Sequence, residues 1–561
     1  MEYSSLTDEE RSELLKTEQD DMKRLRIIRS FSNDDLIIQY GYLIKEEESR
    51  SCITYSLSKL ENKLKIIETL TNEKWITAAT LELPSNEWKI KLLGRVKSGY
   101  YKNMIIRSIK GNDIEIINAL ENVEDEKDKA LIITRLTDDN LKLKYLEEIK
   151  DDVNKSKIII TIDDDKLKVE YIEKLEDKAA KSFLIASLKS NELRESYLES
   201  YDKKYENINV PDGMTIGMEI ECEGKNSVDA YLVSDILDGW NSKVDTSLQE
   251  GVEITSPILS NSKPDTDNLY LVCNVLQELG ENVSERCGGH IHVGASYLKT
   301  KEAYSNLVEL WSNNEELMFL ISNKKGDLLR EGAIEYATPI SMRIGKAIEA
   351  SEFENFNDWD KKEFLDKVKY VQEIGRDREG RRTGINFLTA EAEHRDINTI
   401  EFRLANGTID ANTWIENANL FGGLVAISQR ISDIQHKSIH EIDKEDKSIL
   451  EKFTRLKSKD LSNEERLDML LSLCVPEELK QIYRDRYTEN SRLLEEKPKL
   501  KESLESFISD KPITFTTKSV ANIASYKRMS QVKGAESELI ANFLEYENPT
   551  QTIENSVSLD E

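Results

Sequence analysis

Two histidines in one short segment are the clearest candidates for chemistry in this chain. The chain has five His among its 561 residues, and His290 and His292 both lie in the segment 286–294. Side chains alternate between the faces of a β-strand, so these two imidazoles would share one face. Gly288 and Gly289 directly before them would let a ligand or another backbone come close. The pair predicts a metal or phosphate site if acidic partners are supplied from elsewhere; a hydrogen-bonded core pair is the alternative.

Acidic side chains alternate in the same way in other predicted strands. Glu219 and Glu221 share one face of the segment 215–223, whose other face is apolar. Glu253 lies in the middle of a second such segment, 251–257, although it could instead cap a turn. Carboxylates from several strands would repel one another strongly unless cations lay between them. Carboxylates with one or two imidazoles suit Mg²⁺ or Mn²⁺ better than a structural zinc ion.

Two further segments complete this polar set. Asn386 is the only polar residue in 385–388, and Glu401 shares a strand face with Arg403 in 398–404. The planar guanidinium of Arg403 could bind a phosphate or carboxylate beside the metal. A structural salt bridge between Arg403 and Glu401 is the alternative, because such pairs are common.

The elements that must position these residues form a predicted α+β domain over residues 213–435. Short amphipathic strands alternate with helical segments at 269–279, 301–322 and 411–431. The apolar face of a mainly antiparallel sheet is expected to pack on these helices. Residues 441–545 are expected to be helical again, with a capping box at 462–465. The polar residues 546–561 are expected to form a disordered tail.

Residues 1–205 contain an internal repeat. A Tyr-aliphatic pair begins at Tyr145, Tyr171 and Tyr197, which are 26 residues apart, and a second apolar segment lies between each pair. Asp, Asn and Ser before these segments suit helix caps. One helical hairpin cannot bury its own apolar stripe, whereas a stack can. The pattern predicts an all-α solenoid of ~26-residue hairpins. An irregular helical domain is the alternative, and the Ile run 158–160 could form a strand.

Composition limits the possible partners and the compartment. The formal net charge is −29 and the pI is near 4.9, which disfavours nucleic acid or an anionic membrane as the main partner. The five Cys include no C-x-x-C pair, which predicts a reducing cytoplasm rather than a disulfide framework. We see no apolar leader and no run of apolar residues long enough to span a membrane.

The polar motifs, taken in order, resemble the amidoligase family. The matching set is Gly217–Glu221, Asp245–Leu248, Gly251–Pro257, Gly288–Val293, Asn386 and Thr399–Thr408. The resemblance covers roughly residues 213–435 and leaves the N-terminal repeats outside. This family belongs to the carboxylate–amine ligase superfamily, with glutamine synthetase and glutamate–cysteine ligase. The resemblance implies a glutamine-synthetase-like fold and an ATP- and Mg²⁺- (or Mn²⁺-) dependent ligase that forms an amide through an acyl phosphate.

The resemblance also implies residue roles. The ligands of the metal that bridges the nucleotide phosphates would be Glu219, His290 and Glu401. Those of the metal nearer the acceptor carboxylate would be Glu221 and Glu253. Arg403 would hold the transferring phosphoryl group, and the predicted catalytic residues are Arg403, Glu253 and His292. Residues facing the nucleotide or substrate would be His292 and Asn386, with further phosphate candidates at Arg343, Arg376, Arg378, Arg381 and Arg382. Asp245 and Ser247 occupy a matching loop.

Three functions stay open from the sequence. The first is the ligase, whose substrates are a carboxylate and an amine, with a peptide or protein recruited by the repeats. The second is a non-catalytic interaction protein with a relic ligase domain. The third is a metal-dependent hydrolase that uses the same carboxylates and a bound water.

Overall fold

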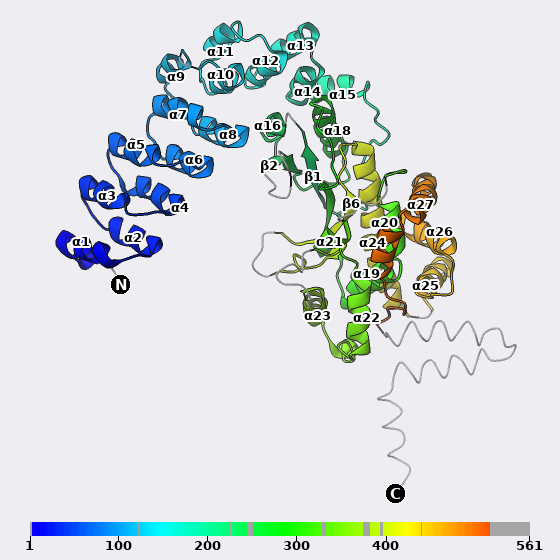
Figure 1. Cartoon of the computed structure of the whole chain (residues 1–561). Helices are drawn as coiled ribbons and strands as arrows, with labels where there is room; N and C mark the ends of the chain where they lie inside the picture. The colour runs from blue at the N-terminus through cyan, green and yellow to red at the C-terminus, as the bar shows by residue number, and fades with distance from the viewer. Residues whose placement is uncertain are drawn as a thin grey trace, which may run out of the picture. The chain divides into compact units, whose positions relative to one another are not determined.

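The chain divides into two compact units (Figure 1). The computed structural model describes residues 3–121, 123–224, 227–243, 248, 251–327, 333–373, 382–392, 397–438 and 440–515. The helical unit comprises Met1–Ser200, Lys225–Leu237 and Val275–Gly280. The sheet unit comprises Tyr201–Gly224, Asp238–Asn274 and Glu281–Glu561.

Short helices make up the described part of residues 1–200, as predicted. Their bounds are α1 (Asp8–Thr17), α2 (Asp21–Ile28), α3 (Asp34–Gly41), α4 (Glu47–Ser51), α5 (Leu60–Glu68), α6 (Glu73–Leu81), α7 (Asn86–Leu92), α8 (Gly99–Arg107), α9 (Asp113–Leu120), α10 (Glu126–Ile133), α11 (Asp139–Leu146), α12 (Asp152–Ile159), α13 (Asp165–Lys174), α14 (Lys178–Ala186) and α15 (Asn191–Leu198). The Ile run 158–160 belongs to the end of helix α12 and not to a strand. Ile158 and Ile159 are buried in the helical packing, and Ile160 is the C-cap of the helix, which removes the strand alternative.

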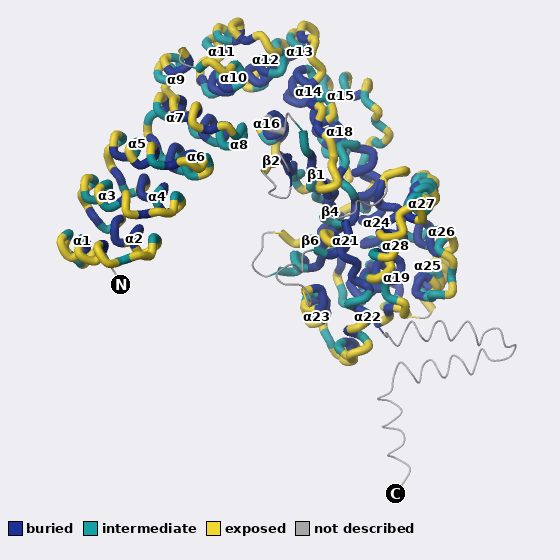
Figure 2. Tube along the Cα trace, viewed as in Figure 1, coloured by how far each residue is buried: buried dark blue, intermediate teal, exposed yellow. Residues whose placement is uncertain are grey.

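The helices recur at a fixed interval. Helices α9, α11, α13 and α15 begin 26 residues apart, and so do α10, α12 and α14. Within this set α10 packs on α12 and α12 packs on α14, which buries the apolar side of each (Figure 2). Asp138, Asp164 and Ser190 cap the helices that follow them by accepting backbone N–H groups, as the sequence predicts.

Acidic residues in the first turns also join one repeat to the next. Asp34 accepts the backbone N–H of Lys59 at 2.9 Å, and Asp113 accepts that of Thr137 at 2.9 Å. Asp165 accepts the N–H of Ser190 at 2.8 Å. In each pair the donor lies 24 or 25 residues after the acceptor. These bonds satisfy backbone groups in the connecting turns that no helix could satisfy by itself.

The sheet unit is built on a six-stranded sheet in the order β2-β3-β1-β4-β6-β5. The strands are β1 (Ile216–Glu223), β2 (Asn241–Lys243), β3 (Gly251–Thr255), β4 (Gly288–Gly294), β5 (Ile385–Asn386) and β6 (Thr399–Asn406). Each neighbouring pair of strands is antiparallel. The predicted antiparallel sheet is thus confirmed.

Helices cover the apolar face of this sheet. The helices of the sheet unit are α19 (Lys301–Asn313), α20 (Glu315–Ile321), α21 (Ala333–Tyr336), α22 (Ser341–Glu349), α23 (Lys361–Glu373), α24 (Ala411–Gln435), α25 (Lys444–Leu456), α26 (Asn463–Cys474), α27 (Lys480–Glu495) and α28 (Pro498–Glu505), with α18 (Lys263–Glu278) divided between the two units. Phe402 of β6 stacks on Phe421 of α24 with ring centroids 4.5 Å apart, and Trp311 of α19 packs on the same Phe402 ring. The sheet core therefore lies on the side of α19 and α24, and the polar residues face away from it.

One predicted helix is interrupted. The segment 301–322 was expected to be a single helix, but α19 ends at Asn313 and α20 begins at Glu315. Asn314 leaves the helical conformation at the junction, and its amide donates to the Leu310 carbonyl at 2.8 Å. Asparagine is a weak helix former, which favours a break at this position.

The C-terminal region contains the helices α25 to α28 and is not helical over residues 506–515, so the predicted helical region ends earlier than expected in the described chain. Ser462 and Glu465 form the predicted capping box of α26. Residue Phe515 packs among Phe353, Phe356 and Phe364, which fixes the end of the described chain to the sheet unit. The predicted helical residues 516–545 and the predicted tail 546–561 lie outside the described residues. Among the described helices, none combines the length and apolar character that crossing a membrane requires.

Candidate metal and phosphate site

The strand register brings the polar residues of five strands to one face. Glu221 of β1 lies opposite Glu253 of β3, and Glu219 lies opposite His290 of β4. Directly opposite residues of an antiparallel pair lie on the same face with their Cβ atoms close together. The polar face of the sheet is therefore continuous from β3 to β4.

The same face continues across β6 and β5. His292 of β4 lies opposite Glu401 of β6, and Asn386 of β5 lies opposite the same Glu401. The register shifts between Gly289 and Ile291, so that Arg403 and Leu404 both stand opposite His290. Such a bulge bends the strand and redirects a side chain. Here the Arg403 guanidinium reaches back along β6 and donates to Glu401.

Gly289 leaves room for the backbone of the neighbouring strand β6. A Cβ atom at this position would lie 2.6 Å from the backbone oxygen of Asn406 on β6. The sequence predicted that the glycines let either a ligand or another backbone come close. At Gly289 the structure supports the close approach of another backbone.

Glu219 lies between the two imidazoles. Its Oε2 is 2.9 Å from His290 Nδ1, and its Oε1 is 3.2 Å from His292 Nε2. His292 Nε2 is also 4.0 Å from Glu401 Oε1, while its Nδ1 is 3.0 Å from the hydroxyl of Thr399. His290 thus hydrogen-bonds to a carboxylate, and His292 hydrogen-bonds to a hydroxyl and lies close to two carboxylates.

Glu221 and Glu253 have different partners. Glu221 Oε2 accepts the backbone N–H of Gly288 at 2.6 Å, and its Oε1 is 3.9 Å from His290 Nε2. Glu253 Oε1 is 2.7 Å from Lys243 Nζ of β2. Lys243 is a site residue that the sequence did not predict, because a single lysine in a three-residue strand gives no pattern. Glu253 does not cap a turn: it lies within β3.

A buried amide network supports Glu401. Asn386 Nδ2 donates to Glu401 Oε2 at 2.7 Å, and Gln372 of α23 donates to the Asn386 side-chain oxygen at 2.7 Å. The Gln372 side-chain oxygen accepts the Phe387 N–H at 3.1 Å. Partners of this kind fix the orientation of a metal-binding carboxylate. Gln372 was also missed from the sequence, since a glutamine on an amphipathic helix is ordinary.

Charges in the cluster shift one another's ionisation. Burial opposes ionisation of Glu219, but the two histidines outweigh it and lower its pKa. Burial likewise opposes ionisation of Glu401, yet the charge of Arg403 and then of the imidazoles lowers its pKa. Burial favours neutral His292, but Glu219 and Glu401 outweigh it and raise its pKa. For Glu253, burial and then the Glu219 charge raise the pKa.

The donor set fits a divalent cation. Within the described residues, one ligand atom each from Glu219, His292 and Glu401 lie within 4.8 Å of one another. Carboxylate oxygens with an imidazole nitrogen suit Mg²⁺ or Mn²⁺. The two ionised carboxylates are balanced here by imidazole and guanidinium groups, which a metal ion would replace as the counter-charge.

The remaining predicted residues divide into two groups. Arg343 of α22 donates to the Gln372 carbonyl at 2.6 Å, and Arg382 lies over the Tyr336 ring at 4.7 Å. Neither of these two contacts is to a cluster carboxylate. The others lie outside the described residues: Asp245, Ser247, Arg376, Arg378 and Arg381.

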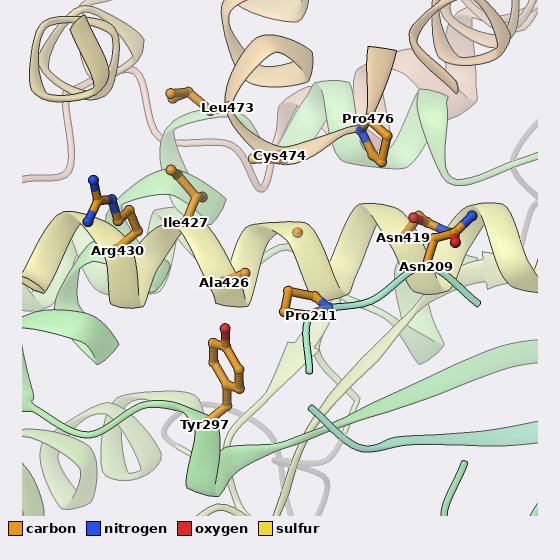
Figure 3. A pocket seen from close by; sticks show the side chains of 11 residues that line it. Asn209, Pro211, Tyr297, Asn419, Ala426, Ile427, Arg430, Leu473, Cys474 and Pro476 are labelled. Atoms are coloured by element: carbon orange, nitrogen blue, oxygen red, sulfur yellow. The ribbon is translucent and has the colours of Figure 1, made fainter. Parts of the chain in front are cut away.

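A separate cavity of about 340 Å³ opens beside α24 (Figure 3). Tyr297, Asn419, Arg430 and Cys474 are among its lining residues, and no residue of the strand cluster lines it. Arg430 pairs with Asp446 at 2.8 Å. The cavity is therefore distinct from the polar face of the sheet.

Of three comparisons with known proteins, one found a match. Residues 173–425 match a family model described as "Putative amidoligase enzyme". Over these residues the chain is similar to the amidoligase family. Searches among curated proteins and among solved structures found no match.

The amidoligase region begins earlier than the sequence motifs predicted. The match starts within α13 and includes α14 and α15, so the expectation that the repeats lie wholly outside the family is wrong. The reason is that residues 173–205 carry none of the polar motifs and resemble the preceding repeats in pattern. The region contains each of the strands β1 to β6, and with them the whole described cluster.

Proposed function

We propose that the chain is an ATP-dependent carboxylate–amine ligase. The observation that carries the proposal is the meeting of Glu219, His292 and Glu401 on one sheet face, beside Arg403, in a region similar to the amidoligase family. We further propose a glutamine-synthetase-like fold for the sheet unit and an α-solenoid for the N-terminal repeats.

The reaction would proceed in two steps. A carboxylate oxygen of one substrate attacks the γ-phosphorus of ATP, the bond from that phosphorus to the β,γ-bridging oxygen breaks, and ADP leaves. The amine nitrogen then attacks the acyl carbon, the carbon–oxygen bond to phosphate breaks, and phosphate leaves while the nitrogen loses a proton. Both steps depend mainly on alignment and on neutralising negative charge.

Metal ions would supply that neutralisation at the phosphate oxygens. Glu219, His292 and Glu401 would hold one ion, supported by the short distances between their ligand atoms. His290 bonds to Glu219 and would orient that carboxylate, which differs from the direct ligand role that the resemblance implies for it. Glu221 and Glu253 would face a second ion nearer the acceptor carboxylate, and there Lys243 would have to leave Glu253.

Arg403 would bind the transferring phosphoryl group. In the structure its guanidinium pairs with Glu401. The same guanidinium would therefore take part in the salt bridge and in phosphate binding. Binding of an ion to Glu401 would free the guanidinium for phosphate, since Arg forks match phosphate oxygens. Asn386 would then act by positioning Glu401 rather than by contacting the nucleotide, because its amide donates to that carboxylate.

Trapping with hydroxylamine tests the ligase assignment. The purified full chain would receive ATP, Mg²⁺ and hydroxylamine with a panel of amino acids and peptide carboxylates. We expect one class of carboxylate to give a hydroxamate together with equal ADP. ADP release without hydroxamate from any carboxylate would contradict the proposal and favour a hydrolase.

Three properties belong to the proposal as expectations. The substrates would be a carboxylate and an amine, at least one of them on a peptide or protein, and the repeats would bind a protein partner. The enzyme would act in the cytoplasm. Pull-down with the full chain, compared before and after substitution of exposed residues of the repeats, tests the partner.

A further inference from the structure

A short segment of the chain between two strands of the sheet belongs to the helical unit. Residues 225–237 follow β1 and precede β2, yet they group with residues 1–200. Their described part contains α16 (Ser227–Ala230) and α17 (Val233–Ile236). Helix α16 packs against α8, and the Tyr231 ring lies 5.7 Å from that of Tyr100. The repeats therefore contact a piece of the strand connection directly.

The main contact is a buried charge cluster. Asp229 is paired through one oxygen with Lys157 Nζ at 2.8 Å and through the other with Lys127 Nζ at 3.0 Å. The Lys157 residue is only 1% exposed and Asp229 is 6% exposed. Burial lowers the pKa of Lys157, and the Asp229 charge is the main influence that opposes this. A charge removed from water needs such a partner, so the lysine and the aspartate depend on each other.

A second contact holds the other end of the segment. Arg107 of α8 pairs with Asp235 of α17 at 2.7 Å and donates to the Tyr231 carbonyl at 3.3 Å. This pair is about half exposed, with side-chain exposures of 41% and 46%. It should be the weaker of the two contacts, because water and salt screen exposed pairs.

Lys157 differs from other buried lysines of the repeats. Lys142 and Lys168 donate to backbone carbonyls of Thr161 and Ser187, each 19 residues further on. Those bonds join neighbouring repeats. Lys157 instead pairs with an aspartate that is not part of any repeat. Its charge is thus not needed to join the repeats and is available to hold the connection.

We infer that residues 229–235 are a docking segment by which the repeats position the β1–β2 connection, with Lys127, Lys157 and Arg107 as the positioning residues. Helix α17 ends at Ile236 and β2 begins at Asn241, so the docked segment leads directly into the strand that carries Lys243. Lys243 pairs with Glu253 of the cluster. The repeats would therefore influence the second part of the site. This inference concerns the placement of strands and does not depend on the proposed reaction.

Hydrogen exchange of the full chain, read by mass spectrometry, tests the docking. In Lys157→Met we expect the amides of residues 229–235 to exchange at least roughly tenfold faster, because the segment loses its main charged partner. Lys168→Met is the matched control: it also removes a buried lysine of the repeats, but its partner is the Ser187 carbonyl. Equal exchange of 229–235 in the two variants would overturn the proposal.

Hydrogen exchange in β2 and β3 tests whether the docking segment positions these strands. Peptides that cover residues 241–243 and 251–255 should also exchange faster in Lys157→Met and not in Lys168→Met. A change confined to 229–235 would overturn the positioning role, because a purely structural contact would not reach these strands.

A further variant covers a failure of Lys157→Met to fold. Lys127 is partly exposed, so Lys127→Met should fold and accelerate exchange of the same peptides, although by less than Lys157→Met. Unchanged exchange of residues 229–235 in Lys127→Met would overturn the pairing as the cause.

Discussion

Acidic side chains accept hydrogen bonds or pair with cations in both the repeats and the sheet, but their partners differ. In the repeats, Asp34 and Asp113 accept backbone N–H groups of the next repeat. In the sheet, Glu219 and Glu401 meet imidazoles and a guanidinium. A backbone amide cannot leave its place without unfolding, whereas a side-chain cation can give way to a metal ion. The difference shows that the partner, not the carboxylate, decides whether an acidic side chain stabilises the fold or is available for chemistry.

This comparison separates the expected effects of substitutions. Changes in the sheet cluster should alter activity and leave the free energy of unfolding nearly unchanged. Changes to the acidic residues of the repeats should lower the free energy of unfolding and leave activity nearly unchanged. The largest effect is expected at the carboxylates of the cluster.

Glu401→Gln and Glu219→Gln should each reduce metal-dependent ATP turnover by roughly 100-fold or more. Each change removes a negative charge that would hold the metal, while the amide keeps the shape of the side chain. Turnover would be measured as ADP release with the carboxylate that gives a hydroxamate. Glu223→Gln is the control, because it changes the same strand outside the three-residue group. Full turnover in both cluster variants would show that these carboxylates are not needed for activity.

Asn386→Ala should weaken Mn²⁺ binding by roughly 10–100-fold, since it removes the amide that orients Glu401. Isothermal titration of the metal alone measures this effect. Asn419→Ala is a matched control: this buried asparagine of α24 bonds to the Ile208 and Ile415 carbonyls, away from the cluster. It should lower stability and leave the metal affinity unchanged. Similar metal affinity in the two variants would show that Asn386 has no positioning role.

Asp113→Asn should lower the free energy of unfolding by about 1 kcal/mol and leave activity unchanged. Burial opposes ionisation of Asp113, but the amides of Thr137 and Asp138 outweigh it and lower its pKa. A lowered folded-state pKa gives stability above the unfolded-state pKa, and this stability disappears as the pH falls through the folded-state pKa. Denaturant titrations should show a constant difference near neutral pH that vanishes in acid. A difference that grew in acid would contradict the role of the charged form.

Much of the sheet could be predicted from period-two alternation. Glu219, Glu221 and Glu253 alternate with apolar residues, and this alone places them on a face opposite the core. The repeats were also predictable, because a 26-residue period and Asp caps are local features of the chain. The break at Asn314 was not predictable from the apolar pattern, which continues across it.

Contacts between distant segments could not be predicted in this way. Lys243, Gln372 and Asp229 each have ordinary local sequence, and their partners lie 10, 14 and 72 residues away in the chain. The family region likewise starts before the first polar motif, in helices that look like the preceding repeats.

The amino-acid sequence by itself determined which side of each strand is polar and where each repeat begins, because side-chain alternation and helix capping act over a few residues. Only the tertiary structure decided which carboxylate meets which cation: the register of β1, β4 and β6, and the bulge at Arg403, select the neighbours. Pairing between strands depends on packing of the whole sheet on α19 and α24, and no short stretch of sequence contains that information.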